Sequence, residues 1–180
     1  MYQQSCYPYR WHNPMYSNWN HNIWCNNWNP HSYNWNTINQ NSYGNIILTD
    51  YGPKPFVVNI DQAAKQNKTY RTALWTGKHF QVTLMSINVG EDIGLEVHPT
   101  TDQFIRIEEG QGLVQMGDSK NKLDFQERAY DNYAIMIPAG KWHNVTNTGH
   151  TPLKIYVIYA PPEHPHGTVH ETKAIATAAE

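Results

Sequence analysis

Four side chains in two short stretches of the sequence are of types that hold metal ions. Glu96 and His98 lie two residues apart, so both point to the same face if that stretch is a β-strand. Gln103 follows after Pro99 and a Thr-Thr-Asp turn, which would let the chain return with Gln103 beside the first pair. His143 opens a later extended stretch, directly after a Pro-x-Gly turn. One carboxylate, two imidazoles and one amide oxygen are therefore expected to converge.

This mixed set of nitrogen and oxygen donors suits Mn, Fe, Co, Ni or Zn better than Ca, and it lacks the thiolates that select copper(I). With a single anionic ligand, a divalent ion leaves the site net positive, which favours a small substrate with an anionic oxygen. The alternative is a metal-free barrel with a polar interior. Gln103 is either a ligand or a donor that orients a bound water, and the adjacent Asp102 should face outward.

The elements that position these residues have the pattern of a β protein. From Tyr43 onward, short runs rich in Val, Ile, Thr, Phe and Tyr recur between Gly and Pro turns, which is typical of a sandwich or barrel. If side chains alternate in direction along the strand from Gln103, Ile105 and Ile107 point inward and Arg106 points outward. The barrel wall near the metal is therefore expected to be apolar. One or two helical turns are expected at 60–67, and a weak helix at the end of the chain. Strands are expected near 45–49, 55–59, 70–76, 79–89, 93–98, 102–109, 111–117, 123–129, 133–137, 142–147 and 152–159.

Catalytic residues are harder to assign. The sequence shows no Ser-His-Asp set, no phosphate loop and no paired carboxylates at catalytic spacing. Candidate polar partners for a substrate are Tyr133, Tyr156 and Tyr159. The sequence pattern does not show where these side chains lie relative to the metal ligands. His164 and His166, separated by a proline, are expected in a strap that packs on the outside of the barrel rather than in a second metal site.

Residues 1–43 differ in composition from the rest of the chain. They carry eleven Asn and five Trp, lack Leu and Val, and contain Cys6 and Cys25. Asn favours turns over helices and strands, and mixed polar and aromatic composition is adhesive. This segment is expected to be either a disordered tail or an adhesive segment that docks on the barrel or on neighbouring molecules. The two cysteines are either free thiols or a cross-link to a neighbour.

Length and charge exclude several function classes. The chain has 180 residues and a formal net charge of −2, so it has no net positive charge that would attract it to nucleic acid. No apolar run approaches the roughly 20 residues of a membrane span. The start, MYQQSCYPYR, lacks the basic and apolar regions of a secretory signal.

The two metal-ligand stretches resemble the paired motifs of the cupin superfamily. The first motif is matched by Gly90, Glu96, His98, Gln103 and Gly110, with Glu96 in place of the first His and Gln103 in place of Glu. The second is matched by Asn132, Pro138, Gly140, His143 and Asn147, with Asn132 in place of Gly, a mild change because Asn tolerates the left-handed backbone. The resemblance implies an all-β, double-stranded β-helix barrel with one divalent transition metal, commonly paired as a homodimer.

Over about 55–175 the chain looks like single-domain bacterial cupins of the mannose-6-phosphate-isomerase-like group, and the tail is similar in composition to Asn- and Tyr-rich spore-coat segments. We expect three parts: the tail at 1–43, the barrel at 44–160, and a C-terminal strap with a short helix at 161–180. One hypothesis is a metal-dependent isomerase or dioxygenase. The other is a structural protein of a spore coat or similar layer, with coat partners bound through 1–43. Location in the cytoplasm or in a spore coat fits both.

Overall fold

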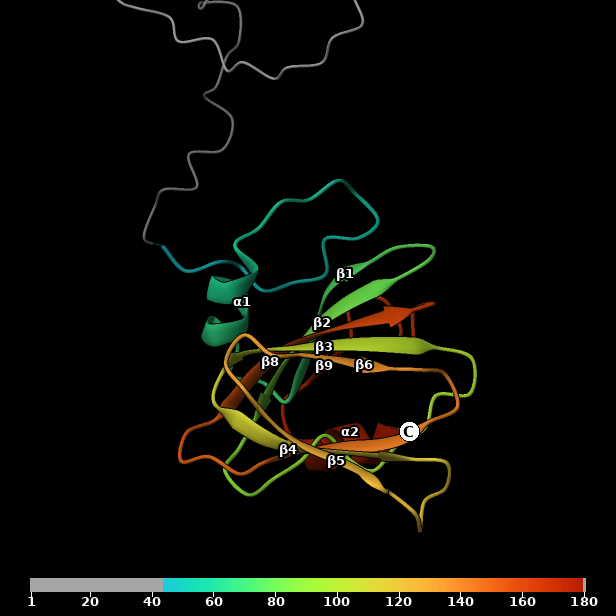
Figure 1. The fold of residues 1–180 in the computed structure, drawn as a ribbon. Helices are drawn as coiled ribbons and strands as arrows, with labels where there is room; N and C mark the ends of the chain where they lie inside the picture. Colours follow the sequence, from blue (N-terminus) through green and yellow to red (C-terminus); the bar gives the residue numbers. More distant parts are fainter. Residues whose placement is uncertain (1–43, 180) are drawn as a thin grey trace, which may run out of the picture. The chain divides into compact units, whose positions relative to one another are not determined.

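The computed structural model describes residues 44–179, which form two antiparallel β-sheets that face each other (Figure 1). The larger sheet has the strand order β6-β3-β8-β2-β1-β9, and the smaller has the order β5-β4-β7. The expected all-β barrel is thus confirmed. The strands are β1 (Arg71–Thr76), β2 (Gln81–Ile87), β3 (Asp102–Glu109), β4 (Gln111–Gly117), β5 (Phe125–Tyr130), β6 (Ala134–Ile137), β7 (Trp142–Asn147), β8 (Leu153–Ala160) and β9 (Val169–His170).

The main core lies between the two sheets, because alternate residues of the strands point inward. On β3, Ile105 and Ile107 are fully buried, whereas Arg106 between them is partly exposed and pairs with Glu108. On β7 the inward residue Val145 is also fully buried. The period-two alternation predicted from the sequence is therefore confirmed for these strands.

A second apolar cluster covers the outer face of the larger sheet. Helix α1 (Ile60–Gln66) places Ala63 and Ala64 against Leu74 and Leu84 of β1 and β2. The helix begins where the side chain of Asn59 accepts a hydrogen bond from the backbone of Gln62, at 3.1 Å. The helical turns expected at 60–67 are thus present, within one residue at the C-terminal end.

Three strands expected from composition are not formed: 45–49, 55–59 and 93–98. In the first segment, the backbone of Ile46 bonds to the side-chain amide of Gln66 instead of to a neighbouring strand. In the second, Pro53 and Pro55 flank a turn and remove two backbone donors that a sheet would need. The third is a loop with one isolated β-bridge, which joins Glu96 to His143 of β7.

The C-terminal segment returns to the barrel. Strand β9 pairs with β1 at the edge of the larger sheet, and it was not predicted because two residues carry no periodic signal. Helix α2 (Lys173–Ala179) follows and buries Ala176. No helix among residues 44–179 is long and apolar enough to cross a membrane. The predictions for 1–43, including those for Cys6 and Cys25, lie outside the described residues.

Candidate metal centre

The structure brings Glu96, His98 and His143 together. Glu96 and His98 lie in the loop between β2 and β3, and His143 lies on β7. The backbones of Glu96 and His143 exchange two hydrogen bonds, of 3.1 and 3.0 Å, which fix the loop against β7. One ligand atom from each of the three side chains lies within 4.8 Å of the others. The first two residues therefore converge through this loop bridge and not, as predicted, by alternation along a strand.

Both imidazoles turn the same ring nitrogen towards the Glu96 carboxylate. Glu96 Oε1 lies 3.2 Å from His143 Nε2 and 3.3 Å from His98 Nε2. At the other side of the His143 ring, Nδ1 lies 2.9 Å from the carbonyl oxygen of Lys141. Because a carbonyl only accepts, His143 Nδ1 carries the proton, and a neutral His143 must then point the Nε2 lone pair at a carboxylate oxygen. Such an arrangement calls for positive charge between the groups, supplied either by protons on the imidazoles or by a cation.

The charge states of the centre follow from the same geometry. Burial alone would raise the pKa of Glu96, but hydrogen bonds from His143 and His98 outweigh it and lower that pKa to about 2. Burial would lower the pKa of His98, but the carboxylates of Glu96 and Glu163 outweigh it and raise that pKa. Glu96 is therefore ionised and ready to act as a ligand. The set of one carboxylate and two imidazoles fits a divalent first-row ion.

Gln103 points into the same interior from the start of β3. Its side chain is buried beside Tyr159 and Ile137, its partners on the neighbouring strands. Its Oε1 has no hydrogen-bond partner among the described residues. That orphaned acceptor is compatible with a ligand role, which stays a prediction. Asp102 is exposed and accepts a hydrogen bond from the backbone of Ala139, so it faces outward as expected.

Glu163 is a site residue that the sequence analysis missed. Its Oε1 lies 3.2 Å from His98 Nδ1, the nitrogen turned away from Glu96. Its Oε2 accepts a hydrogen bond of 3.0 Å from the hydroxyl of Thr101. A carboxylate behind a ligand imidazole fixes the ring orientation and raises its basicity. No motif spacing ties Glu163 to His98, so only the fold could reveal this contact.

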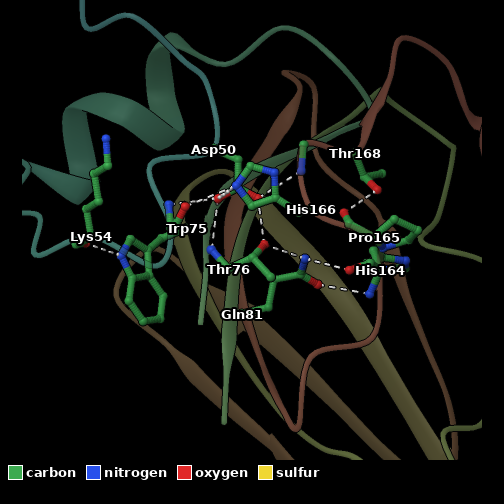
Figure 2. A network of polar contacts seen from close by, with 11 residues as sticks. Asp50, Lys54, Trp75, Thr76, Gln81, His164, Pro165, His166 and Thr168 are labelled. Carbon is green, nitrogen blue, oxygen red and sulfur yellow. Dashed lines mark hydrogen bonds and ion pairs between the residues drawn. The ribbon is translucent and has the colours of Figure 1, made fainter. Parts of the chain in front are cut away.

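The segment 161–170, here called the C-terminal strap, is fastened to the barrel by a polar network (Figure 2). The side chain of Gln81 and the backbone of His164 exchange two hydrogen bonds, of 2.9 and 3.0 Å. The Asp50 carboxylate accepts hydrogen bonds from the backbone and hydroxyl of Thr76 and from the backbone of Gly167. Burial would raise the pKa of Asp50, but these bonds outweigh it and lower that pKa. The strap is thereby held where Glu163 meets His98.

The sequence analysis expected the strap to pack on the outside of the barrel. In the structure, part of the strap reaches a buried residue of the barrel interior. The ring of His164 packs edge-on against the ring of Tyr159, with centroids 5.0 Å apart. Of the three candidate tyrosines, only Tyr159 points into the barrel, where it is fully buried. Tyr133 is exposed, and Tyr156 packs with Phe104 on the outer face of the larger sheet.

An apolar pocket of about 380 Å³ opens next to the centre, between β4, β5 and β6. Its wall includes Met116, which lies directly across from His143 in the β4–β7 pairing. Side chains paired in this way lie on the same face of a sheet, so the pocket adjoins the His143 ring. Phe125 and Tyr133 are half-exposed at its rim. The pocket and the candidate centre are thus neighbours through the Met116–His143 pair.

Comparisons with known proteins agree with this fold. Residues 83–159 match the Cupin domain family. The chain is 71% identical over 136 residues to the protein YrkC of Bacillus subtilis, with 76% of this chain and 73% of YrkC covered. It is 42% identical over 115 residues to protein L612 of Acanthamoeba polyphaga mimivirus, covering 63% of this chain and 70% of L612. The crystal structure of BH2720 from Bacillus halodurans superposes with a TM-score of 0.72 at 70% identity, over 72% of this chain and 98% of that one. The chain therefore belongs to the cupin superfamily.

Proposed function

We propose that this cupin is a metal-dependent enzyme that acts on a small oxygenated substrate. The observation that carries the proposal is the convergence of two imidazole Nε2 atoms on the ionised carboxylate of Glu96, within 4.8 Å. Each imidazole has an acceptor at Nδ1, namely Glu163 or the Lys141 carbonyl, which orients it for binding a metal. The two Nε2 atoms and the carboxylate oxygen face one another, as the ligands of a bound divalent ion do.

The protein's own residues would hold the ion and shape the space beside it. Glu96, His98 and His143 would be ligands, with Gln103 as the fourth. A bound divalent ion would polarise a substrate oxygen as a Lewis acid. The apolar wall that contains Met116 and its neighbours would exclude water from the reacting groups, which strengthens electrostatic interactions there. The volume of about 380 Å³ limits the substrate to a small molecule, such as a monosaccharide or a keto acid.

Two reaction classes agree with this arrangement. An isomerisation of a sugar, as the mannose-6-phosphate-isomerase-like resemblance suggests, would need a proton to move between neighbouring carbons. A dioxygenation would need a redox-active ion such as Fe, and the same ligand set accepts one. The metal that the protein retains would separate them, because Zn supports no redox step.

The test is turnover by metal-loaded protein in sugar-isomerase and oxygen-uptake screens. The matched control is the variant Glu96→Ala/His98→Ala/His143→Ala, prepared and loaded in the same way. We expect a conversion that the wild type performs and the variant does not. Absence of turnover in both screens, with metal bound, would remove the enzymatic proposal.

The composition of residues 1–43 supports a second role, as an adhesive segment in a spore coat or similar layer with the barrel as a scaffold. The two roles are compatible, since an enzyme can be anchored in a coat. Coat partners bound through residues 1–43 belong to this second proposal, whereas a homodimer is proposed from the pairing that is common among cupins. Light scattering on the full chain and on residues 44–180, together with detection in coat and cytoplasmic fractions, tests it. A full chain that stays monodisperse and is absent from the coat fraction would contradict it.

A further inference from the structure

The floor of the apolar pocket between β4, β5 and β6 is made of buried side chains of the barrel interior. Val114, Ala129 and Ile135, one from each of these strands, are 2%, 4% and 6% exposed. The rim differs, since Phe125 is 50% exposed and Met136 is 65% exposed. Large apolar side chains that stay exposed around one opening commonly mark a binding site. The pocket therefore has the form of a site for an apolar group.

Charged side chains belong to the exposed edge of this pocket and not to its floor. Glu127 and Arg128 of β5 also line it, and both are exposed, as is Tyr133. A ligand that enters the pocket thus meets charge only near the solvent and apolar side chains below. The hydroxyl groups of a sugar would lose their hydrogen bonds to water there and find no partner on the side chains of the floor.

A row of side chains joins the pocket to the candidate metal centre. On the inner face of the smaller sheet, Met116 lies across from His143 of β7 on one side and from Phe125 of β5 on the other. Neighbouring strands lie about 4.8 Å apart, so the row spans about 10 Å. A second hollow of about 320 Å³ shares Met116, Phe125 and Met136 with the pocket and reaches Lys141. The carbonyl oxygen of Lys141 is the acceptor at His143 Nδ1, so apolar surface begins beside the centre and continues to the solvent.

We propose that the pocket binds the apolar body of the substrate, and that this substrate is a small carbonyl or carboxyl compound with an aliphatic or aromatic side chain. The substrate oxygen is held at the metal centre, and the carbon chain lies along Met116 towards Phe125, so this inference rests on the proposed function. It narrows the class of oxygenated substrates, because a free sugar carries an oxygen on every carbon of its chain. Each methylene group that leaves water raises the affinity about fourfold.

Calorimetric titration of the metal-loaded full-length protein with a series of hydroxamic acids tests the proposal. Acetohydroxamate and hexanohydroxamate carry the same metal-binding head, and only hexanohydroxamate has a chain that extends into the pocket. Gluconohydroxamate has the chain length of hexanohydroxamate but carries hydroxyl groups along it, so it is the matched sugar-like probe.

The variants remove apolar surface at the rim and leave the candidate ligands and the buried floor intact. Phe125→Ser/Met136→Ser replaces the two rim side chains that the pocket exposes most. Ile47→Ser is the matched control, since Ile47 is 76% exposed and does not line the pocket. Because these side chains are half-exposed or more, both variants should keep the fold, which circular dichroism checks.

We expect hexanohydroxamate to bind at least about tenfold more tightly than acetohydroxamate or gluconohydroxamate, which is less than full burial of its chain would give because the pocket is open on one side. Phe125→Ser/Met136→Ser should reduce this preference to about threefold or less, whereas Ile47→Ser should keep it. Acetohydroxamate should bind both variants like the wild type.

Several results would overturn this inference alone, provided that the protein retains metal. They are equal affinities for hexanohydroxamate and acetohydroxamate, equally tight binding of gluconohydroxamate, an undiminished preference in Phe125→Ser/Met136→Ser, or no hydroxamate binding at all. The first of them is the result expected if a second copy of the chain covers the pocket. Failure of the wild type to retain any metal would instead overturn the proposed function.

Discussion

Replacing Glu163 by alanine should weaken metal binding without unfolding the barrel. The change removes the acceptor at His98 Nδ1, at 3.2 Å, and the partner of the Thr101 hydroxyl, at 3.0 Å. His98 is then free to rotate and to place its proton on the ligand nitrogen. Losing a carboxylate behind a metal ligand typically costs about 10- to 100-fold in affinity. Because the Glu163 side chain is 31% exposed, water can replace part of the interaction. We therefore expect the lower end, about tenfold or about 1.4 kcal/mol.

Competition with a fluorescent zinc chelator measures this loss directly. Glu163→Gln keeps an oxygen that can accept from His98 Nδ1 but removes the charge, so its affinity should fall between wild type and Glu163→Ala. Glu171→Ala is the control, since it removes an exposed carboxylate directly after the C-terminal strap. Circular dichroism should show that all three variants keep the fold. An affinity of Glu163→Ala within twofold of wild type, or an equal loss in Glu171→Ala, would refute the reasoning.

Three further predictions concern stability. Asp50→Asn should lower the free energy of unfolding by about 2–4 kcal/mol at pH 7, because the carboxylate, whose side chain is 1% exposed, accepts several hydrogen bonds, one of them from the Thr76 hydroxyl. The pKa of Asp50 is lowered in the folded state, so this stabilisation is fully present above about pH 4 and is lost as the pH falls through the folded-state pKa. Asn147→Ala should cost about 2–4 kcal/mol, since its side chain donates to two backbone carbonyls and accepts from one backbone amide. Asn132 has a φ of 70°, so Asn132→Val should cost about 1–2 kcal/mol and Asn132→Gly less than about 0.5 kcal/mol.

Urea unfolding followed by tryptophan fluorescence measures all three. A difference between wild type and Asp50→Asn that is as large at pH 3 as at pH 7 would contradict the assigned charge state. A cost below 1 kcal/mol for Asn147→Ala would mean that water replaces its three bonds. Equal stability of Asn132→Val and Asn132→Gly would show that backbone conformation does not govern that position.

The strands that carry the core could be predicted because alternation is a local signal. Ile105 and Ile107 are buried and Arg106 is partly exposed, as a period of two requires. The left-handed backbone at Asn132 agrees with its place at a glycine position of the family motif. Composition alone failed at 93–98, where the segment lies beside β7 but Gly94, with a φ of 93°, interrupts the extended backbone, so that only an isolated bridge forms.

The candidate ligand residues could be picked out from their spacing, but their surroundings could not. Glu96, His98 and His143 stand at motif positions, whereas Glu163 and His164 reach the centre only because the C-terminal strap returns over the end of the barrel. That return depends on Asp50 and Gln81, which are far from the strap in sequence. Contacts between such distant segments leave no periodic pattern to read.

The metal content of the purified protein, measured by mass spectrometry beside the variant Glu96→Ala/His98→Ala/His143→Ala, tests the central claim most directly. The account predicts close to one equivalent of Mn, Fe, Co, Ni or Zn in the wild type and loss of that metal in the variant, with the fold retained. No metal in either protein, even after reloading with each of these ions, would contradict the metal centre and leave the barrel as a scaffold.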